Sequence, residues 1–286
     1  MGMLDEKVAV ITGSSRGLGL AIAQAYAREG AAVVLSGRSA TALMRTVDAL
    51  QQQGARASWQ NTDVGDLSQV KTLADHAIQT FGKIDIWVNN AGISSVYGPT
   101  VACDPQEFES VMRTNILGEY HGSLVAMQYF LARGKGGKLI NLLGRGDKEP
   151  VPYQNAYASS KAWVRNFTLA LAKENAKTGI GIYAFNPGLV NTDLLRKVDV
   201  VEGFEAKLKP FSTIIRLFAN LPSVPAEKAV WLASAATDGK TGLEVKVLGP
   251  RVLLGGVLQE LRRKITHQPM PDTSVELKSV VPYSMF

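Results

Sequence analysis

Tyr157 and Lys161 are the side chains of this sequence best suited to acid–base chemistry. If the segment is helical, their spacing of four residues places both on one face of the helix. A phenol with its ordinary pKa of ~10 exchanges protons poorly near neutral pH, but an adjacent ammonium lowers that pKa by favouring the phenolate. The pair therefore predicts a general acid or base whose proton affinity is set by Lys161.

A glycine-rich turn at residues 12–19 lies between an apolar run at 8–12 and a segment of helical apolar spacing at 18–29. A second apolar run at 32–36 completes a βαβ unit, which typically needs about 30 residues. Glycines in such a turn let the backbone approach a pyrophosphate, and the N-terminus of the following helix attracts its charge. The turn therefore predicts a bound dinucleotide.

The residues after the second run, Ser36-Gly37-Arg38-Ser39, indicate which dinucleotide is bound. A carboxylate at this point would bind the adenosine ribose hydroxyls and repel a 2′-phosphate, and none is present. Arg38 and Arg16 are placed to bind a 2′-phosphate through bidentate, charge-assisted hydrogen bonds. The sequence favours NADP (NADPH); the alternative is that both arginines are solvated surface residues.

Apolar runs and helically spaced segments alternate along the chain, which predicts a parallel sheet covered on both faces. Further strands are expected at 57–61, 84–88, 138–143 and 180–185, and further helices at 40–53, 67–81, 107–133 and 156–177. The predicted fold class is α/β, a Rossmann-type doubly wound sheet in one domain spanning 1–250. Ligands of such sheets bind beyond the carboxyl ends of the strands, where the motifs above fall.

Two segments interrupt this alternation. Residues 198–225 contain three prolines and several aromatic residues, and we interpret them as an inserted substrate loop or lid. Residues 251–286 form a C-terminal extension, with a helix expected at 253–265 and a proline-rich tail from His267 onwards. The tail either covers the site of a neighbouring subunit or is disordered.

Composition restricts the class of protein. The chain has 286 residues, of which 46% are hydrophobic and 20% charged, as is ordinary for a soluble globular protein. The sequence has no apolar run of about 18 residues and no apolar core of a signal peptide near its beginning, so we expect no membrane span. The single cysteine, Cys103, excludes an internal disulfide and fits a cytoplasmic location.

The net charge of +6 does not by itself indicate nucleic acid binding. The basic residues are dispersed, with one tight cluster at 262–264, and no aromatic residues are interleaved with them. A phosphorylated cofactor or an anionic substrate accounts for the charge. His76, His121 and His267 form no metal-ligand spacing with acids or Cys103, so we expect no metal site.

With these motifs in order, the chain resembles the short-chain dehydrogenase/reductase family over roughly residues 5–248. Residues 12–19 look like its cofactor turn, Asp63-Val64 like its adenine contact and residues 89–92 like the element that steadies the central sheet. Residues 186–188 with Thr192 resemble the segment that holds the nicotinamide carboxamide. The resemblance and the turn together imply these cofactor-binding residues: Gly13, Ser15, Arg16, Gly17, Leu18, Gly19, Ser36, Arg38, Asp63, Val64, Asn90, Ala91, Gly92, Tyr157, Lys161, Pro187, Gly188, Val190 and Thr192. For Asp63, capping of the following helix is the alternative.

The resemblance also implies catalytic roles for Asn115, Tyr157 and Lys161. Tyr157 is expected to be the general acid in carbonyl reduction and the base in the reverse direction, which contributes ~10²–10⁴-fold. Lys161 is expected to lower the pKa of Tyr157 and to hold the nicotinamide ribose. Asn115 is expected to position a water in a proton relay. The implied activity is hydride transfer between NADPH and a small-molecule carbonyl or secondary alcohol.

One position departs from the family pattern. The family carries a serine about thirteen residues before the tyrosine, and this sequence has Gly144 there. Loss of one hydrogen-bond donor to an oxyanion costs ~3–4 kcal/mol. Either catalysis is weakened or lost, or another donor such as Arg145, Gln154 or Asn155 replaces the serine, or the glycine makes room for a substrate that is large or carries its own hydroxyl. Gly144, Arg145 and Gln154 are therefore candidate substrate contacts.

Two functions remain open from the sequence. The first is an NADP-dependent oxidoreductase that uses Tyr157, and the second is a non-catalytic NADP-binding scaffold or sensor with the same fold. Arg145 and Asp147 either face the substrate or form a solvated ion pair. Apolar faces on the helices expected at 107–133 and 156–177 predict a homodimer or homotetramer. We expect Trp163 to be a packing residue.

Overall fold

The structure is a computed structural model of the chain and describes residues 2–247 and 274–285. Seven strands form one parallel sheet in the order β3-β2-β1-β4-β5-β6-β8. They are β1 (Val8–Ile11), β2 (Ala32–Gly37), β3 (Ala57–Asn61), β4 (Ile86–Asn89), β5 (Gly137–Leu142), β6 (Ile180–Asn186) and β8 (Leu243–Lys246). The strand order reverses between β1 and β4, which opens a crevice at their carboxyl ends. The predicted doubly wound α/β sheet is confirmed.

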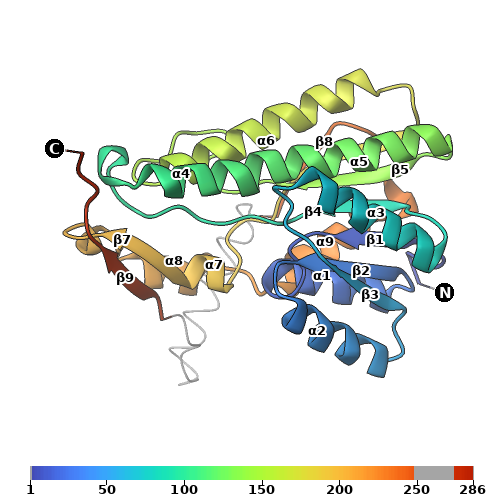
Figure 1. Cartoon of the computed structure of the whole chain (residues 1–286), viewed down its shortest axis with the longest axis horizontal. Helices are drawn as coiled ribbons and strands as arrows, with labels where there is room; N and C mark the ends of the chain where they lie inside the picture. Colours follow the sequence, from blue (N-terminus) through green and yellow to red (C-terminus); the bar gives the residue numbers. More distant parts are fainter. Residues whose placement is uncertain (1, 248–273, 286) are drawn as a thin grey trace.

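Helices cover both faces of the sheet because successive strand residues point to opposite sides. In β1, Ile11 packs in the core beneath one helical layer, whereas Val10, aligned with Val34 and Trp87, packs beneath the other. Helices α1 (Gly17–Arg28), α2 (Ala40–Gln52) and α9 (Ser223–Ala233) form the first layer, and α3 (Leu67–Phe81), α5 (Gly118–Arg133) and α6 (Asn155–Glu174) form the second (Figure 1). Burial on both sides explains why the strands are continuous apolar runs.

The helix expected at 107–133 is divided by a π-helical turn. It consists of α4 (Pro105–Met112), the turn η2 (Arg113–Leu117) and α5, with Asn115 in the middle of the turn. A π-turn re-aims the side chains of a helix and often occurs at functional sites. A Cβ at Gly118 would collide with Val64, so the glycine allows α5 to approach the end of β3 closely.

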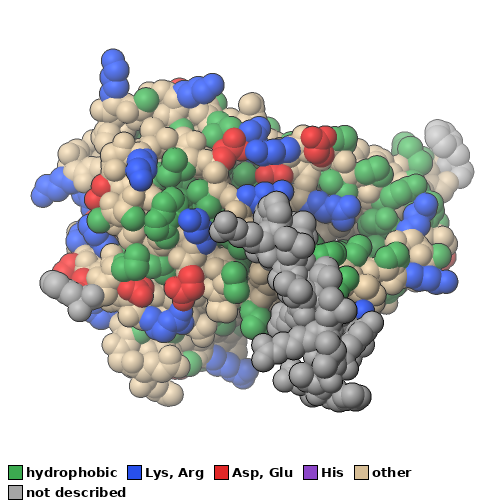
Figure 2. Space-filling view, turned by 180° about the vertical axis from the view of Figure 1, so that it is seen from behind, with side chains coloured by type: hydrophobic (Ala, Val, Ile, Leu, Met, Phe, Trp, Pro, Cys, Tyr) green, Lys and Arg blue, Asp and Glu red, His purple; other side chains and the backbone are tan. Residues whose placement is uncertain are grey.

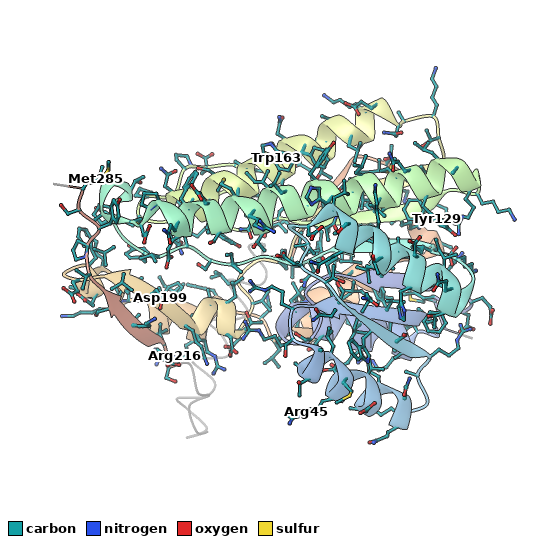
Figure 3. All side chains as sticks on the ribbon, viewed as in Figure 1. Arg45, Tyr129, Trp163, Asp199, Arg216 and Met285 are labelled. Carbon is teal, nitrogen blue, oxygen red and sulfur yellow. The ribbon has the colours of Figure 1, made fainter. Side chains whose placement is uncertain are left out.

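The region after β6 differs most from our expectation. Residues 198–225, expected to be a loop, contain β7 (Lys197–Val201) together with the 3₁₀ turn η3 (Glu205–Leu208), α8 (Phe211–Phe218) and the first turn of α9. The strand β9 (Glu276–Val280) of the C-terminal tail pairs in parallel with β7 of the same chain. Asp199 of β7 and Met285 lie at the end of the molecule away from Tyr129 (Figure 3). The helix expected at 253–265 lies outside the described residues.

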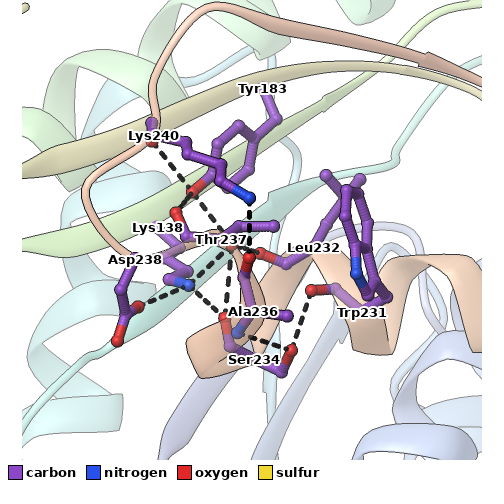
Figure 4. Close-up of polar contacts among 9 residues, drawn as sticks. All are labelled: Lys138, Tyr183, Trp231, Leu232, Ser234, Ala236, Thr237, Asp238 and Lys240. Atoms are coloured by element: carbon purple, nitrogen blue, oxygen red, sulfur yellow. Dashed lines mark hydrogen bonds and ion pairs between the residues drawn. The ribbon is translucent and has the colours of Figure 1, made fainter.

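The strand β8 was not expected, and its place in the sheet depends on a polar cluster near the amino end of β5. The Lys138 ammonium of β5 donates to the Thr237 hydroxyl at 2.8 Å and pairs with the Asp238 carboxylate at 2.8 Å. The Tyr183 hydroxyl of β6 donates to the Thr237 carbonyl at 3.1 Å (Figure 4). These contacts fix the turn that leads from α9 into β8.

The outer surface shows no concentration of positive charge on the face drawn in Figure 2, where lysine and arginine side chains are scattered among acidic and apolar ones. This distribution agrees with the dispersed basic residues of the sequence. Within residues 2–247 and 274–285, no helix combines the length and apolar character needed to cross a membrane.

Candidate functional site

The glycine turn and residues 89–92 lock together at the carboxyl ends of β1 and β4. The Asn90 amide donates to the carbonyls of Thr12 and Gly13 at 2.9 and 3.1 Å. The Thr12 hydroxyl accepts hydrogen bonds from the backbone N–H groups of Asn90 and Ala91, both at 3.0 Å. Two motifs about 80 positions apart in the sequence therefore form one rigid surface.

The glycines of this turn are required by close approaches. Gly13 has a φ of +64°, and a Cβ there would lie 2.8 Å from Ala91 Cα. A Cβ at Gly19 would lie 2.5 Å from the Gly13 carbonyl oxygen. Gly17 faces Thr192, which follows β6, with 3.5 Å from its ideal Cβ to Thr192 Cγ2. The turn thus brings the segment after β6 next to the start of α1.

The start of α1 fits a dinucleotide phosphate. No side chain caps the helix at Arg16, and the first turn contains no acidic residue, so its N–H groups favour an anion. The Ser36 hydroxyl, at the end of β2, is buried and has no hydrogen-bond partner. Ser15 lies near the same point, with its hydroxyl 3.6 Å from an ideal Cβ at Gly37. The chain therefore offers backbone donors and an unpaired hydroxyl where a dinucleotide would lie.

The two arginines expected near a 2′-phosphate are both exposed. Arg38 follows β2 directly. Arg16 has a side chain 77% exposed and lies 3.3 Å from the carboxylate of Asp193, the first residue of α7 (Asp193–Arg196). The sequence analysis did not identify Asp193 as its partner. Because an exposed ion pair contributes little free energy, Arg16 is free to turn toward a phosphate.

The remaining expected cofactor residues lie at neighbouring strand ends. Asp63 accepts a hydrogen bond from the Gly65 N–H at 2.9 Å and lies 3.6 Å from the Arg113 guanidinium. Asp66 caps α3, so the alternative that Asp63 caps this helix is wrong. Val64 is buried. The others occupy the loops after β4 and β6 or the core side of α1: Leu18, Gly92, Pro187, Gly188 and Val190.

Asn115 joins α5 to α6 inside the protein. Its amide nitrogen donates to the Ile93 carbonyl at 3.0 Å and to the Ser160 hydroxyl at 3.1 Å, and its oxygen accepts from the Ile93 N–H at 2.9 Å. These bonds hold the loop after β4 against α6. The Asn115 side chain is thus committed to protein contacts, and its expected role in a water relay stays a prediction.

Lys161 is almost completely buried beside Tyr157. Its ammonium donates to the Leu142 carbonyl at the end of β5 at 2.8 Å and lies 5.9 Å from the centre of the Tyr157 ring. Burial lowers the pKa of Lys161, because it disfavours the charged ammonium. The predicted placement of both side chains on one face of a helix is realised in α6.

Tyr157 differs from our expectation in its proton affinity. Burial, and then the Asp147 carboxylate, raise its pKa to about 12, so the expected lowering by Lys161 is not found. The phenol is therefore protonated at neutral pH. Its hydroxyl lies directly over Gly144, where a Cβ would collide with Tyr157 Oη. The space left by the glycine is filled by the tyrosine hydroxyl.

The other candidate substrate contacts have different surroundings in the structure. Arg145 is exposed, and no Arg145–Asp147 ion pair is found among the described residues. Asp147 instead accepts a hydrogen bond from the Asn186 amide at 3.0 Å. The Asn155 amide donates to the Thr100 hydroxyl at 3.3 Å. Gln154 stands at the N-cap of α6, three residues before Tyr157.

Sequence reasoning missed Glu119, a buried acid in α5 close enough to Lys161 for their charges to interact. A signal existed: Glu119 follows Asn115 by four residues, which places both on one face of a helix.

Comparisons with known proteins agree with this geometry. Residues 7–202 match the short chain dehydrogenase family. The chain is 36% identical over 254 residues to 3beta-hydroxysteroid dehydrogenase 1 of Eggerthella lenta, which covers 88% of this chain and 96% of that protein. It is 31% identical over 251 residues to a diacetyl reductase [(S)-acetoin forming] of Staphylococcus epidermidis, covering 84% of this chain and 96% of the other.

Two solved structures have the same fold. One is 3-ketoacyl-(acyl-carrier-protein) reductase from Brucella melitensis with NADH, with a TM-score of 0.76, 30% identity, and 87% of this chain and 99% of that chain covered. The other is a gluconate 5-dehydrogenase from Burkholderia cenocepacia with NADP and tartrate, with a TM-score of 0.73, 30% identity, and 85% and 94% covered.

Proposed function

The chain belongs to the short-chain dehydrogenase/reductase family, and from this premise we propose that it reduces a carbonyl substrate with NADPH, using Tyr157 as the general acid. It is an NAD(P)-dependent oxidoreductase of the kind that acts on carbonyl or alcohol substrates. The preference for NADPH, the direction of reduction and the individual residue roles are our proposal. The observation that carries it is the buried Lys161 ammonium at the end of β5, 5.9 Å from the centre of the Tyr157 ring.

NADPH is proposed because the end of β2 offers cations and no carboxylate. Arg38 follows Gly37 directly, and Arg16 is held at the start of α1 by an exposed ion pair that is easily exchanged for a phosphate. A guanidinium binds phosphate oxygens in a bidentate way. Ser36 lies beside the glycine turn, since its backbone N–H donates to the Ser14 hydroxyl at 3.0 Å and its carbonyl accepts from the Ser14 N–H at 2.9 Å.

In the reducing direction Tyr157 is the acid, and its raised pKa means that the phenol holds the proton that this step transfers. When bound, the nicotinamide would supply the hydride that the carbonyl carbon accepts. The Tyr157 hydroxyl gives its proton to the carbonyl oxygen, leaving a phenolate that the Lys161 ammonium stabilises. Burial strengthens this stabilisation, because the local dielectric constant is low.

Gly144 occupies the position at which the family is expected to carry a serine. The Tyr157 hydroxyl fills the space above Gly144. We therefore propose that the glycine lets the Tyr157 side chain approach the end of β5 more closely, and that it does not serve to admit a larger substrate. A second donor to the substrate oxygen must then come from elsewhere. Gln154 and Arg145 are the candidates, because neither side chain has a hydrogen-bond partner among the described residues, whereas the Asn155 amide is occupied.

A homo-oligomer is supported by an apolar patch on the outer side of α5 and α6. Tyr120 is 42% exposed and contacts Phe167 edge-on, with the ring centres 6.1 Å apart. Phe167 in turn stacks on Trp163, which is labelled in Figure 3, at 4.8 Å. Leu117, one turn before Tyr120, is 47% exposed. Exposed aromatic residues of this kind are enriched at protein interfaces.

The first prediction tests the general acid. Tyr157→Phe removes the transferred proton but keeps the ring, so turnover of NADPH with a carbonyl substrate should fall ~10²–10⁴-fold while the NADPH dissociation constant stays unchanged. The measurement is cofactor oxidation across a panel of ketones, aldehydes, quinones and imines. Tyr129→Phe, far from the site, is the control. Full activity in Tyr157→Phe would refute the assignment, and NADPH binding without turnover in the wild type would favour a non-catalytic scaffold.

The second prediction concerns Gly144. Gly144→Ala introduces a Cβ that collides with Tyr157 Oη, so the hydroxyl must move. Because a displacement of ~1 Å at a reacting group can cost about 10²-fold, kcat should fall by ~10-fold or more, with little change in cofactor affinity. Gly54→Ala is the control for a loss of stability alone: its φ of +84° makes alanine there unfavourable, but nothing lies within 4 Å of its ideal Cβ, so no site residue is displaced. An unchanged or higher kcat in Gly144→Ala would show that the position of the Tyr157 hydroxyl does not depend on the absence of a side chain at residue 144.

The third prediction concerns the cofactor. Arg38→Ala should weaken NADPH binding by ~10–100-fold, the value of a charge-assisted hydrogen bond of ~1.5–3 kcal/mol, and leave NADH binding unchanged. Gly37→Asp should have the opposite selectivity, because its carboxylate repels the 2′-phosphate. Arg56→Ala is the control, because Arg56 precedes β3 and therefore lies at the amino ends of the strands, opposite the carboxyl ends where Arg38 lies. Equal affinity of the wild type for NADPH and NADH, measured by titration of cofactor fluorescence, would contradict the proposal.

The fourth prediction concerns the oligomer. Tyr120→Glu places a charge in the apolar patch and should shift the full-length chain from dimer or tetramer to monomer in sedimentation velocity, because an unpaired charge is costly to bury. Val101→Glu changes a side chain that is 88% exposed on a separate turn and should leave the mass unchanged. A wild-type monomer at micromolar concentration would refute self-association.

A further inference from the structure

Glu119 is a buried acid for which the mechanism above has no use. Its side chain is 3% exposed, and its Oε1 atom is buried without a hydrogen-bond partner. An isolated carboxylate is costly to bury, so a protein retains one only where a charge or a proton compensates it. The residue therefore needs a partner inside the fold.

The position of Glu119 follows from its neighbours on α5. Asn115 and Ser123 lie one turn before and one turn after it, and all three face the same buried space between α5, α6 and the sheet. Asn115 contacts Ser160 of α6 at 3.1 Å. Ser123 accepts a hydrogen bond from the Asn89 amide of β4 at 3.0 Å. Glu119 thus lies between two contacts that fix α5 against α6 and the sheet.

Lys161 places its ammonium beside Asn115, since Lys161 Nζ and Asn115 Oδ1 lie 3.8 and 3.4 Å from the same point, the ideal Cβ of Gly92. It follows Ser160 on α6, is 4% exposed, and is the one group among the described residues whose charge acts on Glu119. The other groups beside Lys161 are Tyr157 on its own helix, protonated at neutral pH, and Asp147 in the loop after β5, whose field acts on Tyr157. Neither Tyr157 nor Asp147 contributes to the shifts that Lys161 and Glu119 undergo.

We propose that Glu119 is a positioning residue that acts through Lys161: its carboxylate is the internal counter-charge that keeps the Lys161 ammonium protonated as the pH rises. The role rests on the proposed function, in which the ammonium stabilises the Tyr157 phenolate. It adds to that function an acid outside the usual motifs, placed on the helix that carries Asn115.

The electrostatics give the direction of the effect. Burial raises the pKa of Glu119 to about 8, and the nearby Lys161 charge opposes this rise. Burial lowers the pKa of Lys161, and Glu119 opposes that fall. Glu119 therefore releases its proton as the solution becomes mildly alkaline, and the new carboxylate holds the ammonium charged in the range where an isolated buried lysine would lose its proton.

The first arm of the test does not depend on turnover. An unfolded glutamate ionises near ~4.3, whereas Glu119 in the fold keeps its proton to about pH 8. The folded state binds more protons in this window, so stability falls as pH rises through it. The thermal unfolding temperature of the wild type should therefore fall as the pH rises through this window, and Glu119→Gln should abolish the part of this fall that Glu119 causes. It should also remove one protonated-carboxyl band from the infrared spectrum at neutral pH.

The second arm measures kcat/KM against pH. In Glu119→Gln the value near neutral pH should be close to that of the wild type, while the alkaline decline should begin at clearly lower pH, because Lys161 has lost its counter-charge. Glu119→Asp keeps a carboxylate and should restore the alkaline limb in part. Glu107→Gln is the matched control: this acid also has a raised pKa, from burial and then Asp199 and Asp104, but Lys161 does not act on it.

The outcomes separate the inference from the function on which it rests. A uniform loss of activity at every pH in Glu119→Gln, with the alkaline limb unmoved, would show a purely structural role and overturn the inference. So would an unchanged infrared spectrum and an unchanged stability profile, even if the protein showed no turnover. If the glutamine variant does not fold, the aspartate variant tests the same shift. Its alkaline decline of kcat/KM should then begin at a lower pH than that of the wild type.

Discussion

The burial of one ammonium group, that of Lys161, is the constraint on which the arrangement of the site depends. Removing a lysine charge from water is unfavourable unless hydrogen bonds and charges replace the lost hydration. Here the Leu142 carbonyl accepts a hydrogen bond from the Lys161 ammonium, the Tyr157 ring lies beside it, and the Glu119 acid lies within range of its charge. The end of β5, α6 and α5 must therefore meet at one point.

Meeting at that point requires local features that would be unfavourable elsewhere. The π-turn of η2 re-aims Asn115 into the contact with Ser160, and Gly118 removes the Cβ that would keep α5 away from Val64. Buried amides add to this packing, since the Asn89 amide of β4 donates a hydrogen bond to the Asn141 side-chain oxygen of β5 at 3.1 Å. Satisfied polar networks of this kind hold a unique packing, and fixed side chains need no reorganisation during a reaction.

The role of Gly144 depends on the residues that surround it in the fold. In the sequence alone, Gly144 indicates either a missing hydrogen-bond donor or free space for a substrate. In the fold the Tyr157 hydroxyl lies where its Cβ would be, so the glycine and the tyrosine form one fitted pair. Asp147, three residues later, contributes to this arrangement by raising the pKa of the same phenol. The position of the proton is thus decided by a short loop and a helix acting together.

The sequence alone predicted six of the seven strands of the sheet and most helices, because apolar periodicity is a local signal. It did not predict β8 or the pairing of β7 with β9, since short strands gain their stability from partners distant in the chain. Nor did it predict the raised pKa of Tyr157 or the burial of Glu119 beside Lys161. Only the tertiary structure decided these, because proton affinity depends on burial and on charges brought close in space by packing, which no spacing along the chain records.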